Sequence, residues 1–362
     1  MKQPQIDLPR LHFNAARLRS FTWNKLKMEA IALDEGRGKS SVALEALNEL
    51  LTIEPYWAFP GLERIQFLLE LVDTKQWHTF NSAVTHIVRD LVSGSFRNDP
   101  LYNTDTQSGP EEQIHEHDRH KQNYFEVLFV DEIDADEEHA LKHKLRKCRD
   151  QSDQFTYDVI VVRTIQDALI ALLFNHNIQA CVVRYGVPFP SANAHGILRP
   201  FLHFFDALDL STINKSDLGP KLGSIMRDFR PEIDRYYVTD TPLSGLQEST
   251  LKNFRRIFYR SEDLQEMHLT VLRGIRERYE TPFFTALKEY SKRPMGVFHA
   301  MPISRGNSVF KSRWIRDFGE FYGRNLFLAE TSATTGGLDS LLQPTGPLKK
   351  AQELARDAFG SQ

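Results

Sequence analysis

The chain contains few cysteines and no sign of a reactive thiol. Its 362 residues include only Cys148 and Cys181, which do not form a metal-ligand spacing. Cys181 lies in the apolar run 180–183, so we expect a buried structural thiol at this position. Two isolated thiols suit a compartment that keeps thiols reduced, and we therefore expect a cytoplasmic protein.

The sequence also lacks long apolar runs and a strong charge of either sign. It has no run of about 18 apolar residues, and its N-terminus has no signal-peptide core. The net charge of −3 gives no general attraction to nucleic acid or to anionic membranes. We expect neither as a partner. The chain is long enough for two or three domains.

Residues 1–97 are expected to form a helical N-terminal region. Apolar residues recur there at helical spacing in three runs. These runs are Val42, Leu44, Leu47, Leu50 and Leu51; Leu62, Ile65, Leu68, Leu69 and Val72; and Phe80, Val84, Ile87, Val88 and Leu91. The pattern favours a small packed bundle over an interaction module, and its role is open.

Residues 98–123 have the composition of a flexible linker. The segment is polar, rich in turn-forming residues and almost free of large apolar side chains. His115, His117 and His120 could serve as metal ligands. A solvated linker is the favoured interpretation, because such a segment offers no preformed geometry for a metal. We predict no metal site.

From residue 124 the pattern changes to alternating strands and helices. Continuous β-branched runs separated by helices predict an α/β domain with a parallel sheet, here over residues 124–245. A long helical region is expected to follow at 246–279. Strands are expected at 124–130, 157–162, 178–184 and 235–239, and helices at 136–149 and 165–175.

This α/β domain resembles a response-regulator receiver, which has a flavodoxin-like fold. Asp131, Glu132 and Asp134 follow the first strand, where a receiver holds Mg²⁺. The third strand, however, ends in Arg184 and Tyr185, where a receiver has its phosphate-accepting aspartate. We therefore expect a receiver-like shape without phosphotransfer chemistry, used as a packing or assembly surface.

The segment from Thr281 to Gly360 contains several specific motifs. Thr281 and Pro282 are typical of a helix N-cap and first turn, and another helix is expected at 346–359. The motifs are Thr281-Pro-Phe-Phe-Thr-Ala-Leu, Phe298-His, Phe318-Gly-Glu-Phe-Tyr-Gly-Arg-Asn, Leu338-Asp-Ser-Leu-Leu, and Pro344-Thr-Gly-Pro-Leu-Lys-Lys-Ala-Gln-Glu-Leu-Ala-Arg-Asp-Ala-Phe-Gly. Together they resemble the entry to the catalytic core of the bacterial Orn/Lys/Arg decarboxylases.

The resemblance implies a fold-type I enzyme, with an aspartate-aminotransferase-like core that uses pyridoxal phosphate. In such a chain, the receiver-like domain corresponds to the wing domain that bacterial members carry before their core. Full-length relatives are expected to be homo-oligomers acting on a basic amino acid. The implied organisation is a helical region at 1–97, a linker at 98–123, the wing domain at 124–245, connecting helices at 246–280 and the start of the truncated core at 281–362.

Two departures from the family pattern matter. Members typically read His-Thr-Pro-Gly-His where this chain has His299-Ala-Met-Pro-Ile-Ser-Arg-Gly306. More importantly, the family's cofactor lysine lies in a Ser-x-His-Lys motif, which this chain lacks. Its two His-Lys pairs do not complete this motif: His120-Lys121 lies in the linker, and His143-Lys144 lies in the first helix of the receiver-like domain. Decarboxylation needs the pyridinium ring as an electron sink, held by that lysine, so we expect no catalytic or cofactor-binding residues here.

The resemblance also implies residues that border the active site. By resemblance to full-length members, they are Thr334, Thr335, Gly336, Gly337 and Asp339. An equally good interpretation of Gly336-Gly337 is a plain turn.

The sequence thus predicts the N-terminal part of a lysine, ornithine or arginine decarboxylase, inactive alone and without productive cofactor binding. The alternative is a non-catalytic assembly or regulatory protein that binds full-length decarboxylase subunits. The substrate cannot be chosen among the three amino acids. Apolar side chains at Leu348, Leu354 and Phe359 are expected to promote nonspecific association.

Overall fold

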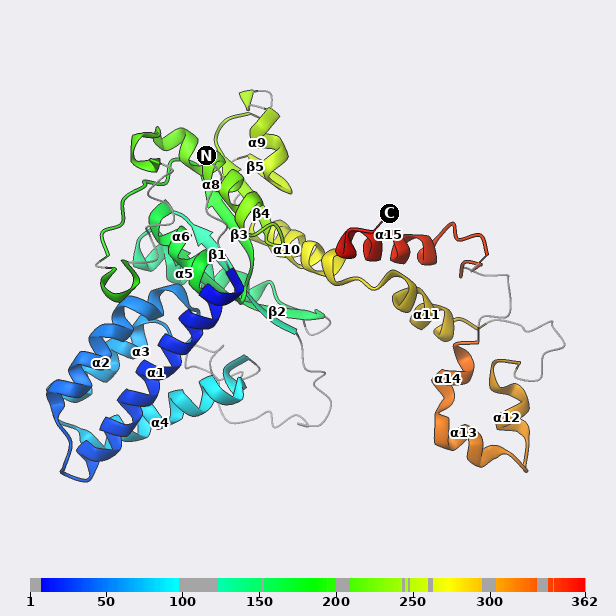
Figure 1. Ribbon diagram of the computed structural model, residues 1–362, viewed down its shortest axis with the longest axis horizontal. Coiled ribbons are helices and arrows are strands. Elements are labelled where there is room, and N and C mark those ends of the chain that lie inside the picture. Colours follow the sequence, from blue (N-terminus) through cyan, green and yellow to red (C-terminus); the bar gives the residue numbers. More distant parts are fainter. Residues whose placement is uncertain are drawn as a thin grey trace. The chain divides into compact units, whose positions relative to one another are not determined.

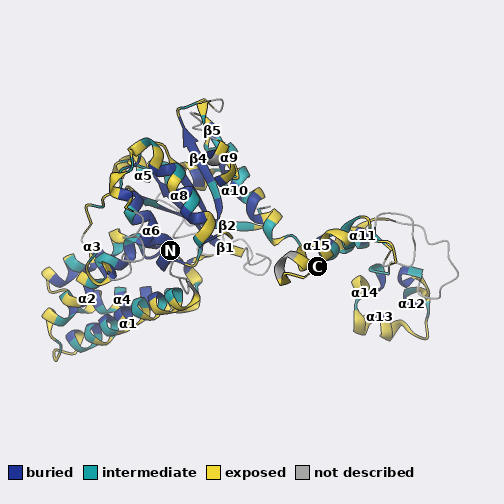
Figure 2. Cartoon of the chain, turned by 45° about the horizontal axis from the view of Figure 1, so that its top comes forward, coloured by how far each residue is buried: buried dark blue, intermediate teal, exposed yellow. Residues whose placement is uncertain are grey.

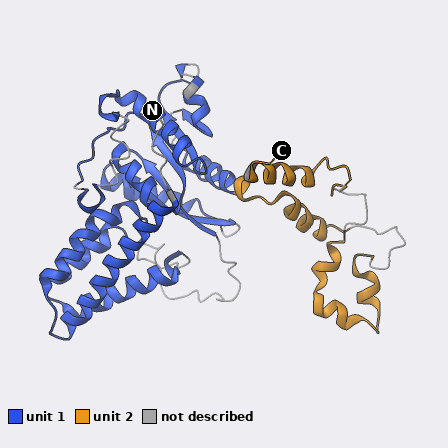
Figure 3. Ribbon diagram, viewed as in Figure 1, with its two compact units in different colours: residues 1–275 blue, residues 276–362 orange. Residues whose placement is uncertain are grey.

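The computed structural model describes residues 8–97, 123–150, 153–193, 195–199, 209–242, 245–246, 248–259, 263–294, 304–330, 338–340 and 342–361. The chain divides into two compact units, residues 1–275 and residues 276–362 (Figure 3). We call them the N-terminal unit and the C-terminal unit. The predicted linker histidines His115, His117 and His120 lie outside the described residues.

The N-terminal unit begins with a helical bundle. Its helices are α1 (Leu8–Asp34), α2 (Ser40–Ile53), α3 (Leu62–Asp73) and α4 (Trp77–Ser93). The last three lie where the apolar spacing predicts them. Their apolar faces meet in one core that includes Leu47, Leu68 and Phe80, all fully buried. α1 packs against α2 and α4 to close this core.

The same unit contains a five-stranded parallel sheet (Figure 1). The strands are β1 (Asn123–Val130), β2 (Phe155–Val162), β3 (Ile178–Arg184), β4 (Asp234–Thr239) and β5 (Arg256–Tyr259). Their order is β2-β1-β3-β4-β5, and every neighbouring pair is parallel. This order is that of doubly wound, flavodoxin-like sheets. The predicted parallel α/β sheet is therefore confirmed.

Helices and the bundle cover the two faces of the sheet. On one face, α6 (Ile165–Phe174) and α8 (Lys215–Phe229) share a core with Ala15, Tyr56 and Trp57 of the bundle. On the other face, α5 (Ala135–Lys147) and α10 (Leu264–Tyr279) cover the second core. Cys181 is fully buried in β3, as expected, and burial raises the pKa of its thiol.

One sequence prediction in this unit is wrong. Residues 246–279 do not form one long helical region, because α9 (Glu248–Asn253) and β5 precede α10. β5 has only four residues, and Arg256 and Tyr259 in it are exposed. Its short length of four residues hides it from a search for long apolar runs, but pairing with β4 extends the sheet.

The C-terminal unit is a set of short helices. They are α11 (Pro282–Lys292), α12 (Asn307–Lys311), α13 (Arg316–Tyr322), α14 (Arg324–Leu328) and α15 (Pro347–Phe359). Thr281 and Pro282 begin α11 as predicted. A Cβ atom on Gly319 would lie 2.7 Å from a ring carbon of Phe310, so glycine permits close packing of α12 on α13. No helix among the described residues is long and apolar enough to cross a membrane.

Candidate functional site

Asp339 is the one residue of the predicted active-site border that the structure describes. Thr334, Thr335, Gly336 and Gly337 lie outside the described residues. The Asp339 carboxylate accepts hydrogen bonds from the backbone N–H groups of Gly346 at 2.6 Å and Leu348 at 2.8 Å. These amides begin α15, so Asp339 caps this helix from seven residues before its N-cap.

The electrostatics of Asp339 agree with a capping role. Desolvation acts to raise its pKa, but the hydrogen bonds from the Gly346, Lys349, Thr345 and Leu348 backbone outweigh it, and the pKa is lowered. The carboxylate is thus held in its ionised form. In this chain the N-terminus of α15 is occupied by a side chain.

The Arg305 side chain packs against the end of α11. Its guanidinium donates to the carbonyls of Tyr290 at 3.2 Å, Ser291 at 3.1 Å and Arg293 at 3.3 Å. It also lies 4.6 Å above the Tyr290 ring. These carbonyls end α11, so a buried cation satisfies the negative end of the helix. The sequence did not predict this role. The departure from the family pattern at 299–306 indicated only that the family's loop residues are missing there, and assigned no contact to Arg305.

The C-terminal unit exposes a group of aromatic side chains on α13 and just before it. Trp314 is 93% exposed and Phe321 is 82% exposed, and Phe318 and Tyr322 are about half exposed. Large exposed apolar patches are typical of surfaces that contact another protein segment. Leu354 and Phe359 on α15 are also exposed, as the sequence leads us to expect, whereas Leu348 is only partly exposed.

The carboxyl edge of the sheet brings Asp131 and Arg184 together. Arg184 Nη1 lies 3.5 Å from Asp131 Oδ2, so the cation that ends β3 contacts the acid that follows β1. Burial raises the pKa of Asp131, and Arg184 opposes that shift. Glu132 approaches Lys215 at 3.9 Å.

The third predicted acid has a local role. Asp134 Oδ1 accepts from the Glu137 N–H, and Glu137 returns a hydrogen bond to the Asp134 N–H, which forms a capping box at α5. In the described part of the chain, no group of three or more His, Cys, Asp and Glu side chains could hold a metal ion.

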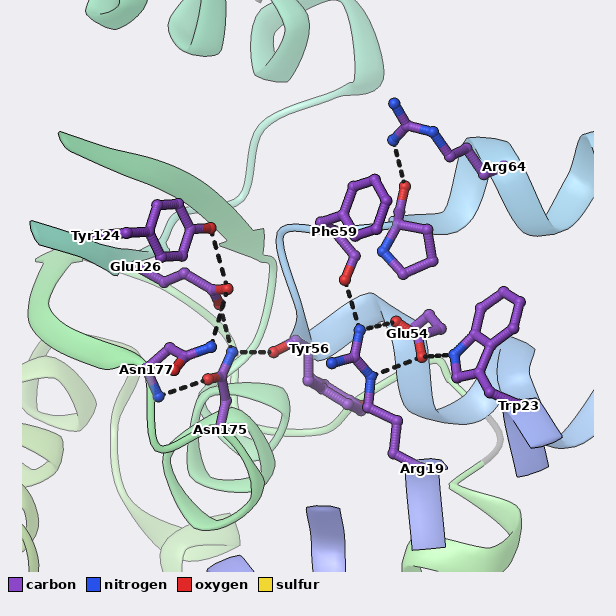
Figure 4. Close-up of polar contacts among 11 residues, drawn as sticks. Arg19, Trp23, Glu54, Tyr56, Phe59, Arg64, Tyr124, Glu126, Asn175 and Asn177 are labelled. Carbon is purple, nitrogen blue, oxygen red and sulfur yellow. Dashed lines mark hydrogen bonds and ion pairs between the residues drawn. The ribbon is translucent and has the colours of Figure 1, made fainter. Parts of the chain in front are cut away.

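A buried ion pair fixes the segment that joins the bundle to the sheet (Figure 4). Arg19 donates two hydrogen bonds to the Glu54 carboxylate, at 2.8 and 2.7 Å. Trp23 Nε1 donates to the same carboxylate at 2.8 Å. Glu54 is fully buried, and the Arg19 guanidinium lies 4.1 Å above the Trp57 ring. The next residues, Tyr56 and Trp57, enter the core of the sheet.

Two further buried carboxylates continue this joint. The Tyr56 hydroxyl donates to Asp167 on α6 at 2.8 Å. Asn175 Nδ2 donates to the Tyr56 carbonyl at 2.8 Å and to Glu126 on β1 at 2.6 Å (Figure 4). Burial raises the pKa of Glu126, while the Asn175 hydrogen bond opposes the shift. No sequence pattern pointed to this network, which connects residues up to 119 positions apart.

Comparison with known proteins bears on the C-terminal unit. Residues 281–362 match the family model described as the Orn/Lys/Arg decarboxylase major domain. Over these residues the chain is similar to the Orn/Lys/Arg decarboxylases. An arginine decarboxylase of Bacillus anthracis is 42% identical over 84 residues, which are 23% of this chain and 16% of the relative. A lysine decarboxylase of Pseudomonas aeruginosa is 34% identical over 80 residues, 22% of this chain and 11% of the relative.

The chain therefore spans less than a fifth of the curated decarboxylases that it matches. Among solved structures, the lysine decarboxylase LdcF of Francisella novicida aligns with 66% of this chain and 29% of its own, with 16% identity and a TM-score of 0.37. A TM-score of 0.37 is too low to assign the fold from this superposition. The fold of the N-terminal unit is therefore assigned from its strand order.

The similarity of residues 281–362 to this family implies pyridoxal phosphate as the cofactor of full-length relatives. The described residues do not fit this cofactor. The amides at the start of α15, which could otherwise bind a phosphate, are donated to Asp339. No Ser-x-His-Lys sequence occurs in the 362 residues, and His143-Lys144 lies on α5 in the N-terminal unit. No catalytic step can be derived from these side chains.

Proposed function

We propose that this chain is the N-terminal part of a pyridoxal-phosphate-dependent decarboxylase. The full-length enzyme would convert lysine, ornithine or arginine to the corresponding amine and CO₂ in the cytoplasm. The observation that supports this most directly is the family match of residues 281–362, with 42% identity to an arginine decarboxylase. The proposal covers the class of basic substrate and does not choose among the three amino acids.

In this proposal the sheet of the N-terminal unit is the wing domain. Two observations support it: the parallel order β2-β1-β3-β4-β5, and the position of the sheet directly before the matched segment. The proposed boundaries are 1–97 for the helical region, 98–123 for the linker and 281–362 for the start of the core. The wing, expected at 124–245, extends at least to Tyr259, because β5 pairs with β4 in the sheet. The full-length enzyme would be a homo-oligomer.

The chain itself would not catalyse the reaction. A decarboxylase of this kind needs a lysine that holds the cofactor as an imine and a ring that accepts the electrons of the departing carboxylate. The 362 residues contain no Ser-x-His-Lys sequence, in which the family carries this lysine, and we therefore expect no productive binding of the cofactor ring. Thr334, Thr335, Gly336, Gly337 and Asp339 would border the active site only when the rest of the core is present.

Absorbance and gas release test the inactivity directly. The purified chain is mixed with pyridoxal phosphate and then with lysine, ornithine and arginine in turn. We expect no imine band at about 420 nm and no release of CO₂. The control is an intact arginine decarboxylase under the same conditions. A stable band from this chain that survives dialysis would contradict the proposal.

A second function is a non-catalytic protein that binds full-length decarboxylase subunits. It is favoured by the exposed aromatic side chains of the C-terminal unit, such as Trp314 and Phe321, which could contact such a subunit. Co-purification separates the two functions. Saturable 1:1 binding of this chain to an intact decarboxylase, abolished by Trp314→Asp, would support the second function. If this chain does not bind an intact decarboxylase, the first function, the N-terminal part of a decarboxylase, is favoured.

A further inference from the structure

A buried histidine lies among the apolar residues that pack α10 on the sheet. The buried residues of this helix recur at helical spacing, and the others are partly or fully exposed (Figure 2). The buried ones are Met267, His268, Val271, Gly274 and Ile275. His268 is the polar member of this group, and its side chain is only 2% exposed. A buried imidazole is costly unless its ring nitrogens have partners, so its contacts affect how firmly α10 is held.

Both ring nitrogens of His268 face partners from outside α10. Nδ1 lies 2.9 Å from the Tyr157 hydroxyl on β2. Nε2 lies 3.4 Å from Oδ2 of Asp153, which precedes β2 and is 17% exposed. An ionised carboxylate can only accept, so Nε2 carries the proton of the neutral ring and the Tyr157 hydroxyl donates to Nδ1. We call Asp153, His268 and Tyr157 the His268 network.

The charges around His268 determine its response to acid. In the described part of the molecule, Asp153 is the one carboxylate within 4 Å of the ring nitrogens. Burial has the largest effect on the pKa of His268 and lowers it, Asp153 acts to raise it, and the nearby Arg149 lowers it. Arg149 is itself paired with Asp158 at 3.1 Å. The neutral ring is therefore the form that fits this site.

The strands at the other side of the sheet hold α10 through different groups. The Tyr236 hydroxyl on β4 donates to the Thr270 carbonyl at 3.3 Å. Arg256 on β5 donates to the Thr270 hydroxyl at 3.0 Å and pairs with Glu266. Both side chains of that ion pair are about two-fifths exposed, so solvent screens it. These contacts do not depend on the protonation state of His268.

We propose that the His268 network is a pH-sensitive switch, which holds residues 264–275 of α10 on the sheet while His268 is neutral and weakens that hold when His268 is protonated. Protonation of Nδ1 removes the acceptor of the Tyr157 hydroxyl and places a cation in a site that is almost closed to water. α10 continues past residue 275 into the C-terminal unit, so acid would loosen the helix that leads into that unit. The proposal does not depend on the decarboxylase assignment.

The direction of the pH effect follows from the two states of the helix. When α10 opens, His268 regains the ordinary histidine pKa of about 6.5, which is above its value in the closed state. The open state therefore binds the proton more readily, and protection of α10 is lost as the pH falls below about 6.5. At pH 5 this effect cannot exceed about thirtyfold, because pH 5 lies about 1.5 units below the pKa of the open state.

Hydrogen exchange of the full chain at pH 7.5 and pH 5, corrected for the intrinsic exchange rates, tests the switch. In the wild type, we expect protection of the 264–275 amides to fall by about threefold to thirtyfold at pH 5. His268→Gln is neutral at both pH values, so it should lose much less. His143→Gln is the matched control, since His143 is exposed on α5, which covers the same face of the sheet. It should respond as the wild type does.

Asp153→Asn supplies a second test that does not remove the histidine. Without the carboxylate that favours protonation, the pH at which α10 loses protection should move downwards. Amides of α6, on the other face of the sheet, should respond to acid equally in the wild type and in His268→Gln. An equal acid response of α10 in these two proteins, or a shift to higher pH in Asp153→Asn, would overturn the proposal.

Discussion

At the scale of single residues, the joint between bundle and sheet depends on Glu54. This carboxylate is fully buried and is stabilised by Arg19 and Trp23. The Arg19 side chain is only 13% exposed, so removing Glu54 would leave its positive charge largely buried and without an ionic partner. The loss of one partner of a buried pair costs more than the pair itself contributes, because an uncompensated charge remains.

We predict that Glu54→Ala destabilises the protein by about 3–5 kcal/mol, the usual cost of breaking a buried ion pair. Urea unfolding followed by tryptophan fluorescence measures the change. The matched control is Glu45→Ala, which removes a pair with Lys25 in which the glutamate side chain is 64% exposed. The control should cost at most about 1 kcal/mol. Similar values for the two variants would show that the buried pair has no special role.

His12 makes the same joint sensitive to acid. Burial and the nearby Arg230 and His176 lower its pKa to about 4, against the opposing effects of the Leu172 backbone and Glu232. In the unfolded chain the pKa of histidine is about 6.5. The unfolded state therefore binds the proton more readily between these values, and stability is lost as the pH falls from about 6.5 towards 4.

We predict that His12→Leu reduces this loss. Thermal unfolding at pH 7, 6, 5 and 4 gives the melting temperature of each protein. The wild type should lose more of its melting temperature on acidification than His12→Leu does. His78→Leu is the control, since the His78 side chain is 92% exposed. Parallel pH profiles of wild type and His12→Leu would exclude His12 as a source of the acid sensitivity.

At the scale of elements, α15 depends on a cap distant in sequence. Asp339 supplies acceptors to the first amides of the helix, and its lowered pKa keeps it ionised. Because this pKa is depressed, the contribution of the cap is present above the ordinary aspartate pKa and is lost as the pH falls through the depressed value. The amphipathic sequence predicts the helix but not the origin of its cap.

We predict that Asp339→Ala increases hydrogen exchange at the Gly346, Leu348 and Lys349 amides several-fold. Glu353→Ala, in the middle of the same helix, should leave those amides unchanged. Exchange followed by mass spectrometry of short peptides can measure both. Equal protection of these amides in Asp339→Ala and wild type would contradict the capping role.

The carboxyl edge of the sheet should not accept phosphate. Arg184 ends β3 and contacts Asp131, so the position of a phosphate acceptor is held by a cation. Incubation with acetyl phosphate and Mg²⁺, followed by intact-mass measurement, should show no stable adduct. Asp131→Asn should behave in the same way. A phosphate that is stable in the wild type and absent in Asp131→Asn would restore the receiver chemistry.

At the scale of the whole molecule, the sequence predicts elements better than their joints. Strands β1 to β4 and helices α2 to α4 follow from apolar periodicity, because each buries a face with a regular spacing. β5 escapes this reasoning, since an edge strand of four residues needs little apolar surface. The docking of the bundle rests on pairs such as Tyr56 with Asp167, 111 residues apart, which no local pattern encodes.

The candidate site shows the same limit. The motifs between 281 and 360 indicate the family correctly, and the match of residues 281–362 agrees with them. The roles of Asp339 and Arg305 depend on where α15 begins and where α11 ends. The sequence alone does not fix these helix ends to the residue, so it could not predict the two contacts. Thr334, Thr335, Gly336 and Gly337 remain predictions.

The central claim is that this chain is the first part of a decarboxylase, and the transcript tests it most directly. Sequencing of the natural message across the codon for Gln362 reveals whether the reading frame continues. The account predicts an open frame that encodes a Gly-Thr-Ser-Thr segment and, further on, Ser-x-His-Lys. A stop codon at this point, with an intact decarboxylase encoded elsewhere, would contradict the account and favour the assembly protein.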